Sequence, residues 1–119
     1  MTLGVLTVAP QDLLDMGLDD VVRDRPDPSA GAPRESFKRL SENASSVSGV
    51  WECTPGRFPV KRDGSHSMMY IVSGTGRIID ADGTAHEIRP GSVHIEPDQW
   101  EGEWEITTTV RKFYVITRS

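Results

Sequence analysis

Three histidines, one cysteine and a turn that holds Lys61 and Asp63 are the side chains of this chain best suited to chemistry. A neutral imidazole acts as a general base near pH 7. A lysine that is held out of water binds an anionic substrate or forms a Schiff base. The catalytic residues stay unassigned at this stage, and the candidates are Lys61, Asp63 and His66.

Each of these residues also has a structural interpretation. His66, His86 and His94 lack the i, i+2 or i, i+4 spacing that places two ligands on one face of an element. We interpret them as surface or interface histidines, with one pH-sensitive or catalytic histidine as the alternative. Lys61 lies in a turn beside other charges, which favours a solvated side chain. No neighbour that would lower the pKa of Cys53 can be named, so we expect a buried, inert thiol.

The elements that position these residues follow from period-two alternation in Gly91–Ile106. In Val93–Glu96 the apolar residues share one parity. In Glu101–Ile106 every odd position is a carboxylate, and every even position is apolar or glycine. Successive strand residues point to opposite faces, so each run predicts a strand with one wet face and one dry face. Pro97 suits the corner between them.

Short segments separated by glycine, proline and aspartate continue through the second half of the chain. Asp82-Gly83 is a strong hairpin signal, and Gly74-Thr75-Gly76 is expected to end a strand. Lys112 falls in a predicted strand, where it can pair with a neighbouring carboxylate. The pattern predicts an all-β sandwich or barrel. The predicted strands are Val50–Thr54, Phe58–Val60, Ser67–Ser73, Arg77–Ala81, Thr84–Ile88, Val93–Glu96, Glu103–Thr107 and Arg111–Thr117.

The N-terminal segment is different in character. Met1–Val8 is β-prone and can pair with a sheet edge. Pro10 to Gly17 has proline near its start and glycine near its end, which predicts a short helix. Arg23–Pro33 contains three prolines and predicts a loop or an extended arm. Arg34–Leu40 is compatible with either a helix or another element.

Composition excludes several classes of protein. The 119 residues suit one domain, and 13 basic against 18 acidic residues give a net charge of −5. There is no basic run, so we expect no nucleic-acid partner. Leu3–Ala9 is too short for a signal or a membrane span, so no membrane partner is expected. A single cysteine is typical of a reducing compartment, and we expect a cytoplasmic protein.

Several motifs resemble one family. Ser67-x-x-Tyr70-Ile71-Val72-Ser73-Gly74 resembles the first cupin motif, and Gly91 with Pro97 six residues later resembles the second. The segments Gly49–Gly56, Pro97–Glu105 and Arg111–Tyr114 resemble the cupin subfamily named after (S)-ureidoglycine aminohydrolase, to which the ethanolamine-utilisation cupin is related. The resemblance covers roughly residues 31–119. It implies a double-stranded β-helix, or cupin jelly roll, with a small-molecule site in its open end. It also implies a homodimer. Residues 1–30 would form a separate arm with the short helix.

The same resemblance implies that the usual metal centre is absent. Metal-binding cupins present two histidines and a glutamate from the first motif and one histidine from the second. The glutamate position falls here on Ser67 and the last histidine position on Gly102. The other two fall on Lys61 and Asp63, or on Val60 and Arg62. A transition-metal site needs three or four protein ligands of suitable type. We therefore expect no metal and no other cofactor.

Strand parity predicts which side chains line the interior. Largely apolar walls with a few polar groups suit a ligand pocket, and they suit a filled barrel core equally well. At Gly102 the missing side chain leaves room for a substrate, or else Trp104 or Trp100 fills the gap. Trp100 is either a lid residue or a dimer contact. The predicted ligand-binding residues are Trp51, Phe58, Ser67, Met69, Gly102 and Trp104.

Three functions follow from these observations. The first is a metal-independent lyase, isomerase or hydrolase acting on a small polar metabolite bound in the barrel. The second is a non-catalytic module that binds a small molecule. The third is a metalloenzyme with rearranged ligands, such as Asp63, His66 and His94, which lie at opposite strand parities.

Overall fold

The computed structural model describes residues 4–119, and this part forms one short helix and nine strands. Residues 1–3 of the predicted edge strand Met1–Val8 lie outside the described part. From Gly4 onward this segment forms no strand, and Val5 and Leu6 are exposed. The elements are α1 (Pro10–Asp15), β1 (Val21–Asp24), β2 (Ala30–Gly31), β3 (Arg34–Glu42), β4 (Ser46–Cys53), β5 (Gly56–Lys61), β6 (Ser65–Asp80), β7 (Ala85–Ile88), β8 (Val93–Glu96) and β9 (Glu101–Arg118).

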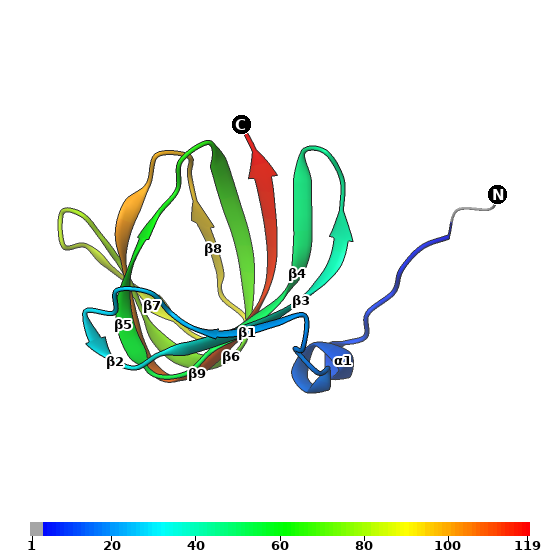
Figure 1. The fold of residues 1–119 in the computed structure, drawn as a ribbon, viewed down its shortest axis with the longest axis horizontal. Coiled ribbons are helices and arrows are strands. Elements are labelled where there is room, and N and C mark those ends of the chain that lie inside the picture. Colours follow the sequence, from blue (N-terminus) through cyan, green and yellow to red (C-terminus); the bar gives the residue numbers. More distant parts are fainter. Residues whose placement is uncertain (1–3) are drawn as a thin grey trace.

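Strand β9 is the centre of the sheet. Its N-terminal half pairs with β5 and its C-terminal half with β4, while β6 runs along both halves. Strands β7 and β8 extend β6, and β1 and β2 lie outside β3 and β5. Every pairing is antiparallel. The sheet curls on itself, with β4 and β5 on opposite sides (Figure 1).

Strands β6 and β9 are each continuous, whereas the sequence predicted two strands in place of each. The prediction that Gly74-Thr75-Gly76 ends a strand is wrong. Gly74 has a φ of 93°, and three register shifts between Ile71 and Gly76 bend β6 while its pairing with β9 continues. A glycine at positive φ allows such a bend at little steric cost. The bend lets two long strands curl into a barrel.

The N-terminal segment contributes to the sheet. The helix predicted from Pro10 is confirmed, and Arg111 fixes it by donating to the carbonyls of Leu13 and Met16 at 3.2 and 3.0 Å. Arg34–Leu40, which the sequence left open, lies in β3. Within residues 4–119 no helix is long and apolar enough to cross a membrane.

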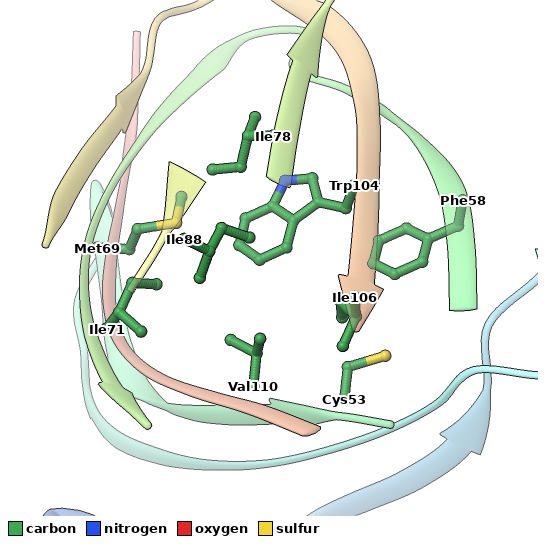
Figure 2. Packing of buried hydrophobic residues seen from close by; sticks show 9 residues of the cluster. All are labelled: Cys53, Phe58, Met69, Ile71, Ile78, Ile88, Trp104, Ile106 and Val110. Atoms are coloured by element: carbon green, nitrogen blue, oxygen red, sulfur yellow. The ribbon is translucent and has the colours of Figure 1, made fainter. Parts of the chain in front are cut away.

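The inward parity predicted for Trp104 is confirmed, and this ring occupies the middle of the core. It is 1% exposed and packs with aliphatic side chains from β6, β7 and β9 (Figure 2). Glu103 and Glu105 alternate with it and form ion pairs with Arg57 outside the barrel. The remaining core residues are Cys53, Phe58, Met69, Ile71, Ile78, Ile88, Ile106 and Val110.

The bend at Gly74 yields a stability prediction. A Cβ at this position would lie 2.1 Å from the backbone oxygen of Thr109, whereas Gly83, with a matching φ of 92°, has no atom within 4 Å. We expect Gly74→Ala to lower the free energy of unfolding by about 3 kcal/mol and Gly83→Ala by about 1 kcal/mol, because only the first adds a backbone clash to left-handed strain. Urea denaturation of both variants measures this, and equal losses would contradict the close approach.

Candidate functional site

A cavity of about 380 Å³ lies inside the barrel, between strands β1, β3, β4, β5 and β9. Its aromatic walls are Phe37, Trp51, Phe58, Trp104 and Tyr114. Its charged wall residues are Arg23, Arg25, Glu35, Arg39, Lys61, Arg62 and Lys112. Six of these seven charged groups are basic, although the chain as a whole is acidic. The cavity is therefore a local concentration of positive charge with aromatic walls.

Lys112 is the most deeply buried of these basic groups. Strand β9 carries it at inward parity, opposite Trp51 of β4. Its side chain is 6% exposed, and its Nζ lies 4.6 Å from the ring centroid of Trp51 and 4.5 Å from that of Trp104. Both distances suit cation–π attraction. Within residues 4–119 its one polar contact is the Sδ of Met69, at 3.8 Å.

Burial changes the ionisation of this lysine. Loss of hydration lowers the pKa of Lys112 from 10.5 to about 8, and the charge of Glu96 works in the opposite direction. The positive charge of Arg62 adds to the lowering. A buried ammonium is tolerated only when its surroundings replace part of the water it has lost. Near neutral pH the side chain is a mixture that is mainly ammonium with some free amine.

Two buried glutamates hold the two indole rings beside Lys112. Glu96 accepts a hydrogen bond from Trp104 Nε1 at 2.8 Å and forms an ion pair with Arg62 at 2.8 Å. Glu35 accepts from Trp51 Nε1 at 2.9 Å. Each carboxylate therefore fixes the plane of one ring, so the two faces stay turned toward the same ammonium.

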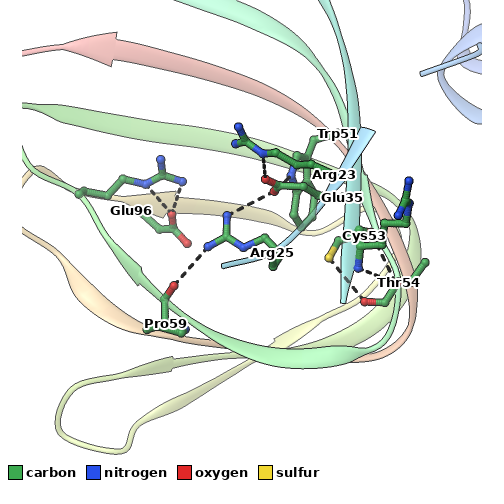
Figure 3. Close-up of polar contacts among 10 residues, drawn as sticks. Arg23, Arg25, Glu35, Trp51, Cys53, Thr54, Pro59 and Glu96 are labelled. Carbon is green, nitrogen blue, oxygen red and sulfur yellow. Dashed lines mark hydrogen bonds and ion pairs between the residues drawn. The ribbon is translucent and has the colours of Figure 1, made fainter. Parts of the chain in front are cut away.

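The N-terminal arm supplies the charges that compensate Glu35. Arg23 Nε lies 2.7 Å from this carboxylate, and Arg25 Nη1 lies 3.3 Å from it (Figure 3). Burial alone would raise the pKa of Glu35, but the hydrogen bonds from Trp51 and Arg23 and the charges of both arginines outweigh it and lower the pKa. Glu35 is thus held as an anion at neutral pH.

The predicted ligand-binding residues divide into two sets. Trp51, Phe58 and Trp104 line the cavity together, with ring centroids 5.5 Å apart for the two tryptophans and 6.4 Å apart for Phe58 and Trp104. Ser67 and Met69 point inward as predicted and are buried, but neither belongs to the cavity wall. The Oγ of Ser67 is buried without a hydrogen-bond partner.

Gly102, the sixth predicted residue, does not open into the cavity. A Cβ there would lie 2.4 Å from the ring of Trp100. This tryptophan therefore fills the space beside Gly102 that a substrate could otherwise have occupied. Trp100 is half-buried against the core, and its Nε1 donates to Asp80 at 2.8 Å. Of the two interpretations of Gly102, the structure has the one in which a tryptophan fills the gap.

The three candidate catalytic residues do not converge. Lys61 reaches the cavity wall, but it is 62% exposed and forms an ion pair with Glu101 at 3.2 Å. Asp63 is exposed and accepts from Gln99 at 3.1 Å. His66 has the parity of the outer face and lies outside the cavity wall.

The remaining histidines lie elsewhere. His94 lines a smaller cavity of about 220 Å³ together with His86. Burial is the main cause that lowers the pKa of His94, so its ring is neutral at pH 7. The Nε2 of His86 forms a hydrogen bond with the carboxylate of Asp80 at 2.8 Å. Neither ring reaches the larger cavity.

The residues present do not fit the divalent metal of other cupins. Within residues 4–119 no three His, Cys, Asp or Glu side chains gather closely enough to hold an ion. The ammonium of Lys112 repels a cation placed in the cavity, and Glu35 and Glu96 are already engaged by arginine and indole donors. The rearranged set of Asp63, His66 and His94 does not assemble. The absence of a bound metal in the purified protein stays a prediction, which elemental analysis would test.

Sequence reasoning missed the centre of this site. It placed Lys112 in a strand beside a carboxylate but did not place it inside the barrel. The sequence signal that could have placed Lys112 inside the barrel was parity, because Trp104 and Lys112 are both even-numbered residues of one continuous strand. Glu35 lies in Arg34–Leu40, whose secondary structure the sequence left undecided, and Arg25 lies in Arg23–Pro33, which was predicted to be a loop or an extended arm. No local pattern identifies either residue as part of the site.

Replacing Lys112 tests its burial through pH dependence. Between pH 8 and 10.5 the unfolded chain binds more protons at this lysine than the folded chain does, so its destabilising contribution begins to fall at about pH 8 and is lost as pH approaches 10.5. We expect Lys112→Met to be more stable than wild type near pH 7, and this advantage to shrink by about 2 kcal/mol by about pH 9.5.

The matched control is Lys38→Met, since Lys38 is 40% exposed and lies outside the cavity wall. Urea denaturation of all three proteins across this pH range measures the differences. A stability gap that does not change with pH for Lys112→Met would contradict a buried, partly deprotonated lysine.

Cys53 gives a second prediction. It is fully buried, and loss of hydration, followed by the charge of Glu35, raises the pKa of its thiol to about 12. We expect no reaction with a disulfide reagent at pH 8 in the native protein and full reaction in denaturant, because the thiolate is the reactive form. Rapid labelling of the native protein would contradict the inert thiol.

Comparisons with known proteins agree with this architecture. A family model described as the EutQ-like cupin domain matches residues 40–114. The search of curated proteins found no match. The solved structure of the Clostridium difficile EutQ protein has a TM-score of 0.64 and 19% identity, over 73% of this chain and 64% of that chain. The chain thus spans less than two thirds of that relative.

Two further solved structures are similar. Ectoine synthase from P. lautus has a TM-score of 0.70 and 14% identity, over 96% of this chain and 78% of that chain. A protein of unknown function from Pseudomonas syringae pv. tomato has a TM-score of 0.69 and 23% identity, over 85% and 46%. Likeness at such identities establishes the fold alone. The all-β cupin fold predicted from the sequence is confirmed, and with most of its length matched by the family model, the chain belongs to the EutQ-like cupin family.

Proposed function

We propose that this protein binds a small, negatively charged metabolite, a carboxylate of a few carbon atoms, in the cavity of the barrel. The observation that carries the proposal is the ammonium of Lys112. Lys112 lines the cavity and is 6% exposed, and no oxygen atom of residues 4–119 accepts a hydrogen bond from its ammonium. Buried charged donors normally have acceptors, so a ligand oxygen is the natural partner.

Arg25 supports the same assignment. Its guanidinium lies 4.3 Å from the ring centroid of Phe58, on the wall of the same cavity. Its Nη atoms make two long contacts of 3.3 Å, to Glu35 and to the carbonyl of Pro59, while its Nε is buried with no hydrogen-bond partner among residues 4–119. A guanidinium with a spare donor is suited to a carboxylate.

Size and wall chemistry limit the ligand. A volume of about 380 Å³ is at the small end of the range for ligand pockets. The aromatic rings favour a compact ligand with an apolar part between the charged contacts. The basic wall disfavours a cationic ligand.

The arm and the oligomeric state belong to the same proposal. We retain the division into an arm, residues 1–30, and a barrel, residues 31–119, in which the arm provides Arg23 and Arg25 to the cavity. The homodimer implied by the family resemblance stays a prediction. Ureidoglycine hydrolysis is not proposed, because Ser67 and Gly102 stand at two of the expected ligand positions.

Two classes of function share this site. A non-catalytic module requires only the anion contacts, whereas a metal-independent enzyme also requires a side chain able to react with the ligand. The candidates Lys61, Asp63 and His66 are solvated or lie outside the cavity wall, so binding is the function that the geometry supports best.

A matched pair of probes tests the proposal. Propionate and propionamide have nearly the same shape, and only the first is charged. We expect propionate to quench the fluorescence of the cavity tryptophans at millimolar concentrations and propionamide to do so far less. We expect Lys112→Met to weaken propionate binding about tenfold or more, since a hydrogen bond to a charged group contributes about 1.5–3 kcal/mol.

Lys38→Met is the control and should bind as wild type does. Equal binding of propionate and propionamide, or wild-type affinity in Lys112→Met, would overturn the proposal. So would the absence of saturable binding of acetate, propionate and succinate.

A further inference from the structure

Lys112 differs from an ordinary anion-binding lysine in the surroundings of its nitrogen. Two indole rings lie within 4.6 Å of the Nζ, a thioether sulfur is its one polar neighbour within residues 4–119, and Lys112 is one of the residues that line the cavity. Salt-bridging lysines instead have a carboxylate in contact, as Lys61 has Glu101 at 3.2 Å. Within residues 4–119 no carboxylate forms a salt bridge with Lys112, so no ion-pair partner holds the nitrogen once a proton leaves.

We propose that Lys112 is a carbonyl-reactive amine, which forms a Schiff base with a small oxo acid bound in the cavity. This inference rests on the proposed function, because the carboxylate of the oxo acid uses the same anion-binding wall. It narrows the ligand from carboxylates in general to carboxylates that carry an aldehyde or ketone carbon next to the acid group.

The covalent step balances without any other reactant. The free amine of Lys112 attacks the carbonyl carbon, and a carbon–nitrogen bond forms while the carbonyl oxygen takes up a proton to give a carbinolamine. The carbinolamine then loses its oxygen as water. In total, one ammonium and one carbonyl compound give one protonated imine and one water, with the net charge unchanged.

The surroundings suit the product as well as the reactant. The protonated imine carries the same positive charge as the ammonium, so the faces of Trp51 and Trp104 attract both. The indole N–H groups donate to Glu35 and Glu96, which keeps negative charge at the edge of each ring. The two indole rings and their carboxylates therefore stabilise a cation at the nitrogen before and after condensation.

Charges that face this nitrogen also set how much free amine exists. Glu96 and Glu35 favour the ammonium, Arg62 and Arg25 disfavour it, and burial is the largest cause of the lowering of the Lys112 pKa to about 8. An exposed lysine has a pKa about two units higher and far less free amine near neutral pH. Arg25 lines the same cavity as Lys112, so we assign to it the carboxylate of the oxo acid.

Reductive trapping tests the inference. The protein is incubated with pyruvate and sodium cyanoborohydride, which reduces an imine to a stable secondary amine, and the peptides are then mapped by mass spectrometry. The chain has three lysines, Lys38, Lys61 and Lys112, so the assignment is direct. We expect the reduced adduct at Lys112, formed at least tenfold faster than at Lys38 or Lys61.

The expected pattern has three further parts. Lys112→Met loses the rapid adduct and Lys38→Met retains it. Propionate, which has no carbonyl carbon open to attack, competes with pyruvate and slows trapping. The trapping rate rises from about pH 6.5 to about pH 8.5 as the amine loses its proton.

The outcomes separate the two proposals. Saturable binding of propionate without a preferred adduct at Lys112 overturns the Schiff base and leaves anion binding in place. Failure of both overturns both. Equal labelling of all three lysines also overturns the Schiff base, because it reports only the general reactivity of amines. Mapping of the wild-type protein gives this result even if a variant fails to fold.

Discussion

The ammonium of Lys112 lies against the rings of both Trp51 and Trp104, in an interior that offers it little water. A bare charge in such a place would be very costly, and the neighbourhood is arranged to reduce that cost. Glu35 and Glu96 accept one indole N–H each, which fixes the rings and keeps negative charge at their edges. Neither carboxylate touches the ammonium itself. The nitrogen is thus stabilised at a distance, in a residue that lines the cavity.

This arrangement depends on strands from distant parts of the chain. Strand β9 supplies Trp104 and Lys112, and β4 sets Trp51 opposite Lys112 through backbone pairing. The arm adds Arg23 and Arg25, which compensate a carboxylate of β3. The barrel of this chain gathers a lysine, two indoles and two arginine-paired carboxylates. The positive charge in the barrel is therefore carried by side chains of the chain itself.

Period-two alternation was enough to predict an all-β sandwich or barrel and the inward direction of the two tryptophans, whereas the cupin fold was implied by the motif resemblance. In Val93–Glu96 the apolar residues lie on the wet face, because Val93 and Ile95 are exposed and Glu96 is buried. Glutamates flank Trp104 on the opposite parity, so the dry face of that segment was unambiguous. The segment around Lys112 has apolar residues on both parities, and the alternation there gives no direction. Treating β9 as two strands also prevented the parity of Trp104 from being carried forward to Lys112. The roles of Glu35 and Arg25 arise from pairing between segments far apart in sequence, which no local pattern encodes.

Because β9 borders β4, β5 and β6, these three strands gain a shared neighbour only when the last strand of the sheet has docked. Until then each has an unpaired edge, a state in which two copies of the chain can pair with each other. Contacts of such long sequence separation also form slowly. A slip of β9 by one residue would bury Glu103 and Glu105 and turn Trp104 out into water, so the alternating carboxylates penalise wrong registers during assembly. The strand that shapes the chemistry of the barrel is thereby also the one that governs how safely the protein folds.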